Sequence, residues 1–181
     1  MVPTTVGGYL QSLPNERRVA MARVCSMIRR SARGVRESMR FGLAFYELDG
    51  QPIFAVESAD DALRLYVVEQ DVVFQLKDTY KNINPMRYCA EFFDLNCMPL
   101  DVVEKMVRLS MAMRRANKEV PVPSQQDLVR MWGIHEEDFT AAPPIVRIAV
   151  NRNDPIAAVD PAAPAPEGEA PDDATSVTTK A

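Results

Sequence analysis

The chain has 181 residues, of which 47% are hydrophobic and 25% are charged, and its formal net charge is −4. This length predicts one domain with an appendage. The sequence lacks the roughly 20 consecutive apolar residues of a membrane span, the pattern of a secretory signal, and the P-loop, G-x-S-x-G, G-x-G-x-x-G and C-x-x-C motifs, which disfavours the best-marked enzyme classes.

The first half of the chain predicts a long helix followed by antiparallel strands. Pro14 suits a first helical turn, and apolar residues then recur at helical spacing as far as Ala32, so we expect a helix over 14–32. Asp49-Gly50 separates apolar runs at 45–48 and 52–56, which predicts a hairpin. Alternating residues over 63–67 predict a third strand.

The second half predicts a helix over 72–81, a strand over 88–93 and a second long helix that begins at Pro99. Pro121-Val122-Pro123 breaks this helix, and Ser124 suits the cap of a short helix over 125–132 that Gly133 ends. Together these elements predict an α+β fold, namely a two-layer α-β sandwich in which the long helices cover one face of an antiparallel sheet.

Composition divides the chain into a folded domain over 1–120, a helical extension over 121–150 and a tail over 151–181. The tail is rich in proline and alanine and holds six acidic and two basic residues, whereas 1–150 has equal numbers of each. We expect the tail to be disordered. The chain has three cysteines, Cys25, Cys89 and Cys97, and their spacing is not that of metal ligands, so we expect them to fill the core or the surface. An odd number of cysteines suits a reducing compartment, and we expect the cytoplasm.

Acidic residues gather between Glu47 and Asp78, where eight carboxylates face two basic residues. Glu57, Asp60 and Asp61 lie at the end of one predicted strand and in the loop after it. Converging carboxylate oxygens attract hard cations such as iron, manganese or magnesium, so these three residues are the candidate metal ligands. The alternative is a solvated acidic edge that discourages aggregation.

Arginines dominate the first 40 residues, which contain eight of them and two glutamates. Their planar guanidinium groups suit anionic partners. The alternatives are a solvated helix face or ion pairs with the acidic segment, and the absence of lysine and of interleaved aromatic residues disfavours nucleic acid. A second, metal-free hypothesis is a binding module for a small anionic ligand or a partner protein. It would use the segment 36–45, with Arg40 as anchor and Phe41 and Tyr46 as apolar contacts.

Several short motifs, in order, resemble the YdhG-like family of small bacterial proteins. They are Tyr9-Leu10, Ser12-Leu13-Pro14, Glu16-Arg17-Arg18, the segment 37–45, Asp49-Gly50-Gln51-Pro52-Ile53-Phe54, Leu63-Arg64-Leu65-Tyr66 and the segment 99–104. The resemblance spans roughly 9–115. One branch of this family is described as a frataxin-like iron chaperone with an α-β sandwich fold, which supplies iron to cluster or haem assembly.

The resemblance implies a non-enzymatic, intracellular iron-binding and iron-donating protein. Iron would be held weakly, with Glu57, Asp60 and Asp61 as ligands, because a donor must release its metal. Proteins of iron-cluster or haem assembly would be its partners. The sequence predicts no association with membranes and leaves the oligomeric state open.

Overall fold

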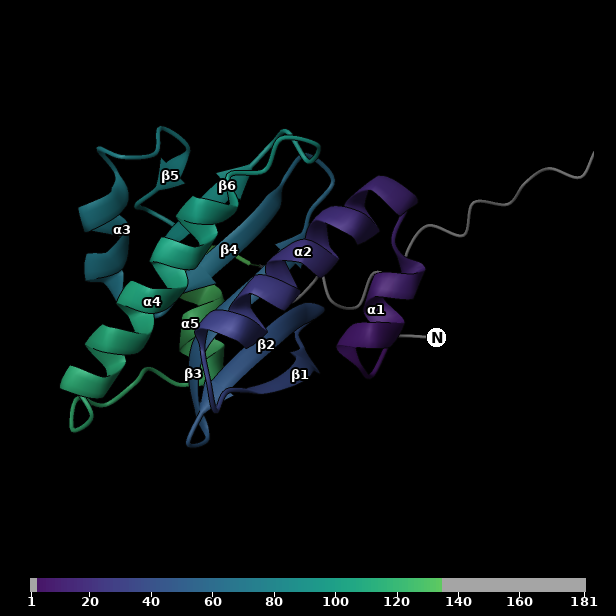
Figure 1. Ribbon diagram of the computed structural model, residues 1–181. Helices are drawn as coiled ribbons and strands as arrows, with labels where there is room; N and C mark the ends of the chain where they lie inside the picture. The colour runs from purple at the N-terminus through teal and green to yellow at the C-terminus, as the bar shows by residue number, and fades with distance from the viewer. Residues whose placement is uncertain (1–2, 135–181) are drawn as a thin grey trace, which may run out of the picture. The chain divides into compact units, whose positions relative to one another are not determined.

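Within residues 3–134, which the computed structural model describes, six antiparallel strands form one sheet, and two long helices cover one of its faces (Figure 1). The chain divides into two units, Met1–Ile145 and Val146–Ala181. The tail predicted over 151–181, and the part of the predicted helical extension beyond residue 134, lie outside the described residues. The strands are ordered β1-β2-β3-β4-β6-β5 across the sheet. Their bounds are β1 (Arg36–Arg40), β2 (Leu43–Leu48), β3 (Gln51–Ser58), β4 (Leu63–Val67), β5 (Ile83–Asn84) and β6 (Cys89–Phe92).

The first long helix, α2 (Asn15–Ser31), forms where its apolar spacing predicts. Pro14 precedes the helix, Glu16 lies in its first turn, and Arg29 and Arg30 lie in its last turn, so charges of the favourable sign occupy both ends of the helix dipole. One face of α2 is buried against the sheet and against α4. The buried residues are Ala20, Met21, Val24, Cys25, Met27 and Ile28.

The second long helix, α4 (Leu100–Ala116), follows Pro99 and also carries matching charges, with Asp101 in its first turn and Arg114 and Arg115 in its last turn. Its inner face is largely apolar and includes Val102, Val103, Met106 and Val107, whereas Met113 is only partly buried. Met98, Met106 and Met111 fill the core between α4 and the sheet. The expected two-layer α+β architecture is therefore confirmed.

The hairpin between β2 and β3 turns at Asp49 and Gly50, as expected. Both residues have positive φ angles, 52° and 80°, which are typical of a type I′ turn that follows the twist of the strands. In the register that results, Ala44, Tyr46, Phe54 and Val56 pack on the helix side of the sheet, which we call the helix face. Leu43, Phe45 and Ala55 point to the opposite side, the outer face.

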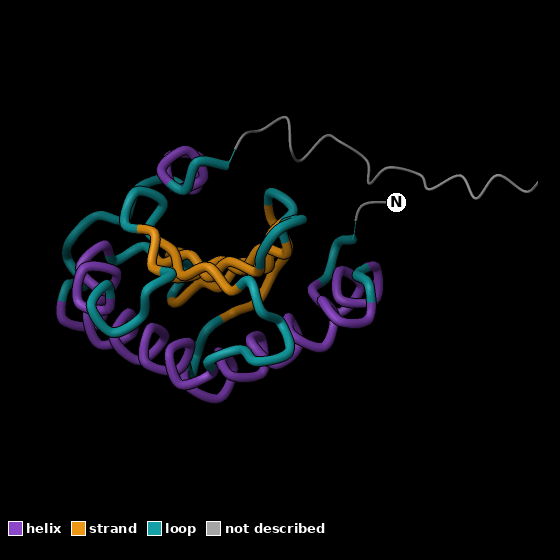
Figure 2. Tube along the Cα trace, turned by 90° about the horizontal axis from the view of Figure 1, so that it is seen from above, coloured by secondary structure: helices purple, strands orange, loops and turns teal. Residues whose placement is uncertain are grey.

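A short helix, α5 (Gln125–Met131), covers part of the outer face (Figure 2). The hydroxyl of Ser124 accepts a hydrogen bond from the backbone N–H of Asp127 at 3.2 Å, and Gly133 has a φ of 66°, which confirms the predicted cap and the predicted end. Trp132 is fully buried against Phe45 and Tyr66. Because α5 covers this side, central residues of β2 and β4 are buried on both faces of the sheet.

Three elements were not expected from the sequence: α1 (Val6–Ser12), the edge strand β1 and the two-residue strand β5. The helix α3 (Gln70–Leu76) is present where a helix was predicted over 72–81, but it begins two residues earlier and ends five residues earlier. None of the helices within the described part of the chain is long and apolar enough to cross a membrane. The division between 1–120 and 121–150 stays a prediction, although α5 packs on the same sheet as the long helices.

Candidate functional site

The three carboxylates proposed as metal ligands are arranged around an arginine. Glu57 on β3 and Arg64 on β4 are register partners on the outer face. The Arg64 guanidinium lies 3.5 Å from Glu57 Oε2 and 2.8 Å from Asp61 Oδ2. It also lies 2.9 Å from Glu91 Oε1 on the neighbouring strand β6. Two of the three proposed ligands are therefore paired with a cation.

These ion pairs change the pKa values of Arg64 and Asp61. Burial alone would lower the pKa of Arg64, but its hydrogen bond to Glu91 and the nearby charges hold that pKa above its ordinary value. For Asp61, slight burial works to raise the pKa, and the attraction of Arg64 outweighs it, so the pKa of Asp61 lies below its usual range. Glu57 Oε2 also accepts a hydrogen bond from the Tyr66 hydroxyl at 2.6 Å.

Asp60 is exposed in the loop between β3 and β4, and its backbone carbonyl accepts a hydrogen bond from the Arg17 guanidinium of α2. Between residues 3 and 134, no group of three carboxylate, thiol or imidazole side chains is placed to hold a metal ion. Iron binding by Glu57, Asp60 and Asp61 stays a prediction.

If iron binds at these carboxylates, replacing all three with their amides should lower the affinity at least tenfold, since weak sites depend on ligand charge. An anaerobic calorimetric titration of ferrous iron into the natural chain and into the triple variant measures this. Equal affinities of the two proteins would exclude this site.

The segment 36–45, proposed as a ligand or partner contact, does not form one surface. Arg40 extends over the outer face, where it donates a 2.7 Å hydrogen bond to Gln125 Oε1 and lies 3.3 Å from Glu47 Oε2. Phe41 is half-buried near Phe45, with ring centroids 6.4 Å apart. Arg40 therefore fastens α5 to the sheet.

Tyr46 differs from the expectation of an exposed contact residue. It is fully buried on the helix face, opposite to the face that carries Arg40, because successive residues of β2 alternate between the two sides. Burial raises the pKa of its hydroxyl far above the ordinary value, and the nearby Cys25 of α2 raises it further. Tyr46 belongs to the core.

The positions of the three cysteines agree with the expectation that they fill the core or the surface. Cys25 and Cys89 are buried, whereas Cys97 is exposed, and all three are free thiols. Burial raises the pKa of Cys25 to about 11 and that of Cys89 to about 12, so neither thiol ionises at neutral pH. These two residues act as small hydrophobic side chains.

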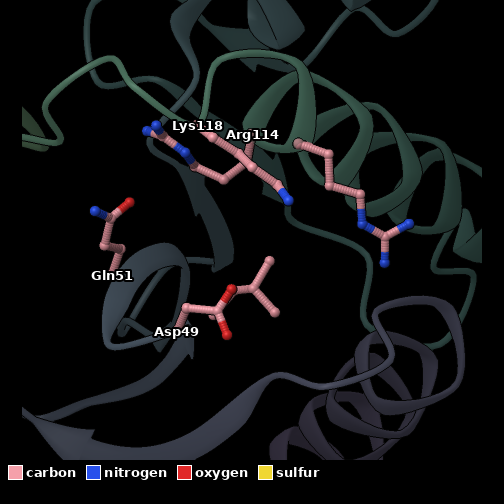
Figure 3. Close-up of a pocket in the computed structure, with 6 residues that line it drawn as sticks. Asp49, Gln51, Arg114 and Lys118 are labelled. Carbon is pink, nitrogen blue, oxygen red and sulfur yellow. The ribbon is translucent and has the colours of Figure 1, made fainter.

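A different part of the molecule combines a cavity with charged side chains. The β2–β3 hairpin and the C-terminal end of α4 form the walls of an open cavity of about 170 Å³ (Figure 3). Leu48, Asp49 and Gln51 line it from the hairpin, and Arg114, Arg115 and Lys118 line it from the end of α4 and the turn beyond. We call it the hairpin pocket.

Arg114 supports this pocket rather than facing it. Its side chain is 5% exposed, and its guanidinium donates hydrogen bonds to the backbone carbonyls of Asn117 and Val120, the latter at 2.7 Å. The same group lies 3.3 Å from Glu69 Oε1. In Figure 3 it turns away from the gap between Lys118 and Asp49. Arg114 thereby fixes the turn that carries Lys118.

The remaining charged groups of the hairpin pocket lie on opposite sides of it. Arg115 and Lys118 are exposed cations from α4 and its following turn, and Asp49 is an exposed carboxylate at the tip of the hairpin. Within residues 3–134, none of the three is in an ion pair. The sequence indicated the Asp49-Gly50 turn, but it gave no sign that this turn lies beside the end of α4.

Comparison with solved structures supports the fold. The chain is similar to the crystal structure of YdhG, a protein of the DUF1801 family from Bacillus subtilis, with a TM-score of 0.53 and 12% sequence identity. The fold is similar to that of a DUF1801 protein. The match covers 62% of this chain and 93% of YdhG. At this identity it supports the fold of the YdhG-like resemblance and gives no support to its frataxin-like branch.

No family model and no curated protein matches the chain. The fold likeness to YdhG therefore carries no activity or site residues to this chain. Function must be argued from the geometry of its own side chains.

Proposed function

We propose that the protein is a metal-free binding module that holds the anionic group of a small ligand in the hairpin pocket. Arg115 and Lys118 would contact the anion, and Arg114 would position them from behind. This proposal keeps the ligand class expected from the arginine-rich sequence. It moves the site from the segment 36–45, where Arg40 is already held by Gln125 and Glu47.

One observation carries the proposal. Arg115 and Lys118 lie beside a cavity, and neither of them forms an ion pair with another of the described residues. Other arginines of α4 differ: Arg108 lies 2.6 Å from Glu104, and Arg114 lies 3.3 Å from Glu69. An anion entering the pocket would meet a guanidinium and an ammonium that need not first break an ion pair. Guanidinium and ammonium groups both bind phosphate and carboxylate oxygens.

The size of the cavity limits the ligand. Its volume of about 170 Å³ is below the roughly 300 Å³ at which pockets for drug-sized molecules begin. A carboxylate or phosphate group with few further atoms suits this space. A large nucleotide or a folded protein segment would leave most of its surface outside.

The chemistry of the lining favours binding over catalysis. The six lining residues supply no hydroxyl, thiol or imidazole group, and the carboxylate of Asp49 and the ammonium of Lys118 are both exposed to solvent rather than held in a water-excluded site. We therefore propose a non-enzymatic role. The free thiols of Cys25, Cys89 and Cys97 support a reducing compartment such as the cytoplasm, which imaging of a tagged chain would test.

Titration with inorganic phosphate or propionate should perturb the backbone NMR signals of the hairpin and of residues 114–118 in a saturable way. We expect the Arg115→Gln, Lys118→Gln double variant to bind about tenfold more weakly and at most about 30-fold, because each exposed charged contact contributes up to about 1 kcal/mol. Affinity should also fall with rising salt, because these charges are open to solvent.

The matched control is Arg108→Gln with Lys105→Gln, which likewise removes one arginine and one lysine charge, here from the exposed side of α4. This control should bind phosphate and propionate like the natural chain. Equal losses in the two double variants would show that only net charge matters, and perturbations spread over the whole surface would contradict a site in the hairpin pocket.

A further inference from the structure

The hairpin pocket places charges of opposite sign on its two walls. Figure 3 shows the Lys118 ammonium and the Asp49 carboxylate reaching toward the same gap from α4 and from the hairpin. The two groups are not within ion-pair distance, and Asp49 has no hydrogen-bonded side-chain partner among residues 3–134. A ligand in the gap would therefore contact a cation at one end and a carboxylate at the other.

The balance of charge around the pocket argues against a purely anionic ligand. Arg114 is offset by Glu69, and the C-terminal end of α4 adds about half a negative charge from its backbone dipole. Asp49 adds a full negative charge. Arg115 and Lys118 therefore exceed the negative charges nearby by only about half a unit, so a bare anion gains attraction from one wall and meets repulsion from the other.

The position of Asp49 is fixed by its turn. Its φ of 52° and that of Gly50, 80°, belong to the type I′ hairpin, which leaves the Asp49 side chain little freedom in the direction it leaves the backbone. Because the backbone of Asp49 is ordered before a ligand arrives, binding does not have to order the turn. Asp49 is thus suited to receive a donor group.

Resting on the proposed function, we infer that the hairpin pocket selects a small zwitterion, namely an α-amino acid of the size of alanine. Its carboxylate contacts Arg115 and Lys118, and its ammonium contacts Asp49. The cavity of about 170 Å³ is below the roughly 300 Å³ of pockets for drug-sized ligands, and alanine has only six heavy atoms.

The test compares three probes on the full chain by NMR titration: alanine, propionate and ethylamine. Propionate is alanine without the ammonium group, and ethylamine lacks the carboxylate. We expect alanine to bind about fivefold more tightly than propionate, as one exposed ion pair allows, and ethylamine to bind most weakly. Asp49→Asn should abolish the preference for alanine and raise the affinity for propionate, because the repulsion is removed.

Asparagine tolerates a positive φ, so Asp49→Asn should preserve the turn, and unchanged amide signals outside residues 48–52 verify this. Asp78→Asn, at an exposed position outside the pocket lining, is the matched control and should keep the preference for alanine. Equal binding of alanine and propionate to the natural chain would overturn the selection by Asp49 and leave anion binding intact. Absence of binding by all three probes would overturn both the selection and the proposed function.

Discussion

Replacing Trp132 with alanine should lower the free energy of unfolding by about 3–5 kcal/mol, the range found when large buried aromatic residues are truncated. Trp132 is fully buried, and its ring lies 5.2 Å from that of Tyr66 and 5.9 Å from that of Phe45. Its indole N–H also donates a 3.2 Å hydrogen bond to the backbone carbonyl of Val67. Urea denaturation followed by circular dichroism measures the loss, since Trp132 is the single tryptophan and its fluorescence disappears in the variant.

A second variant separates packing from hydrogen bonding. Trp132→Phe retains most of the apolar surface but loses the donor to Val67, so it should lose about 1–2 kcal/mol. Val120→Ala, at a side chain that is 55% exposed, should leave stability within about 0.5 kcal/mol of the natural chain. If Trp132→Ala were as stable as Val120→Ala, the packing of Trp132 on the outer face of the sheet would not contribute to the stability of the fold.

Local signals in the sequence predicted most of the helices and the central hairpin. The apolar spacing of α2 and α4 and the Asp49-Gly50 turn each involve residues close in sequence, and the structure confirms them. The same holds for α5, whose Ser124 cap and Gly133 end lie within ten residues. These elements were accessible because their determining interactions are local.

Elements that depend on tertiary contacts were missed or misread. Strand β1 contains Arg36, Glu37 and Arg40 and has no strong strand propensity, so only its pairing with β2 makes it a strand. The sequence therefore predicted no strand there, and Arg40 was proposed as the charged anchor for an anionic ligand or a partner protein. Tyr46, on the next strand β2, was proposed as an apolar contact, whereas its position in the register with β3 directs it into the core.

The candidate site was the least accessible feature. Asp49 and Lys118 are separated by 68 intervening residues, and only the packing of α4 along the sheet brings the hairpin beside its C-terminal end. The acidic segment was visible in the sequence, but Arg64 is one of two basic residues within it, and its central position among the carboxylates appears only when β3, β4 and β6 are paired. The composition of a segment shows how many charged residues it contains, but it does not show which of them form ion pairs in the folded chain.

Replacing Arg64 with leucine should lower the free energy of unfolding at pH 7 by about 2–4 kcal/mol. The range for breaking a buried ion pair is about 3–5 kcal/mol, and we reduce it because Asp61 is largely exposed. The variant would leave Glu57, Asp61 and Glu91 close together without their shared cation. Adding Glu57→Gln and Glu91→Gln to Arg64→Leu should restore part of the loss, because the amides remove the repulsion.

The pH dependence tests whether charge is the cause. In the natural chain the pKa of Asp61 is lowered on folding, so its contribution to stability is present above the unfolded pKa of about 3.9 and is lost as the pH falls through the lower folded value. In Arg64→Leu the neighbouring carboxylates would repel one another without their shared cation, so this chain gains relative stability as the pH falls and protonation removes the repulsion. Urea denaturation between pH 7 and pH 3.5 should therefore show the difference between the two proteins shrinking toward acid. A difference that stays constant over this range would mean that Arg64 stabilises the sheet through the packing of its side chain and not through its charge.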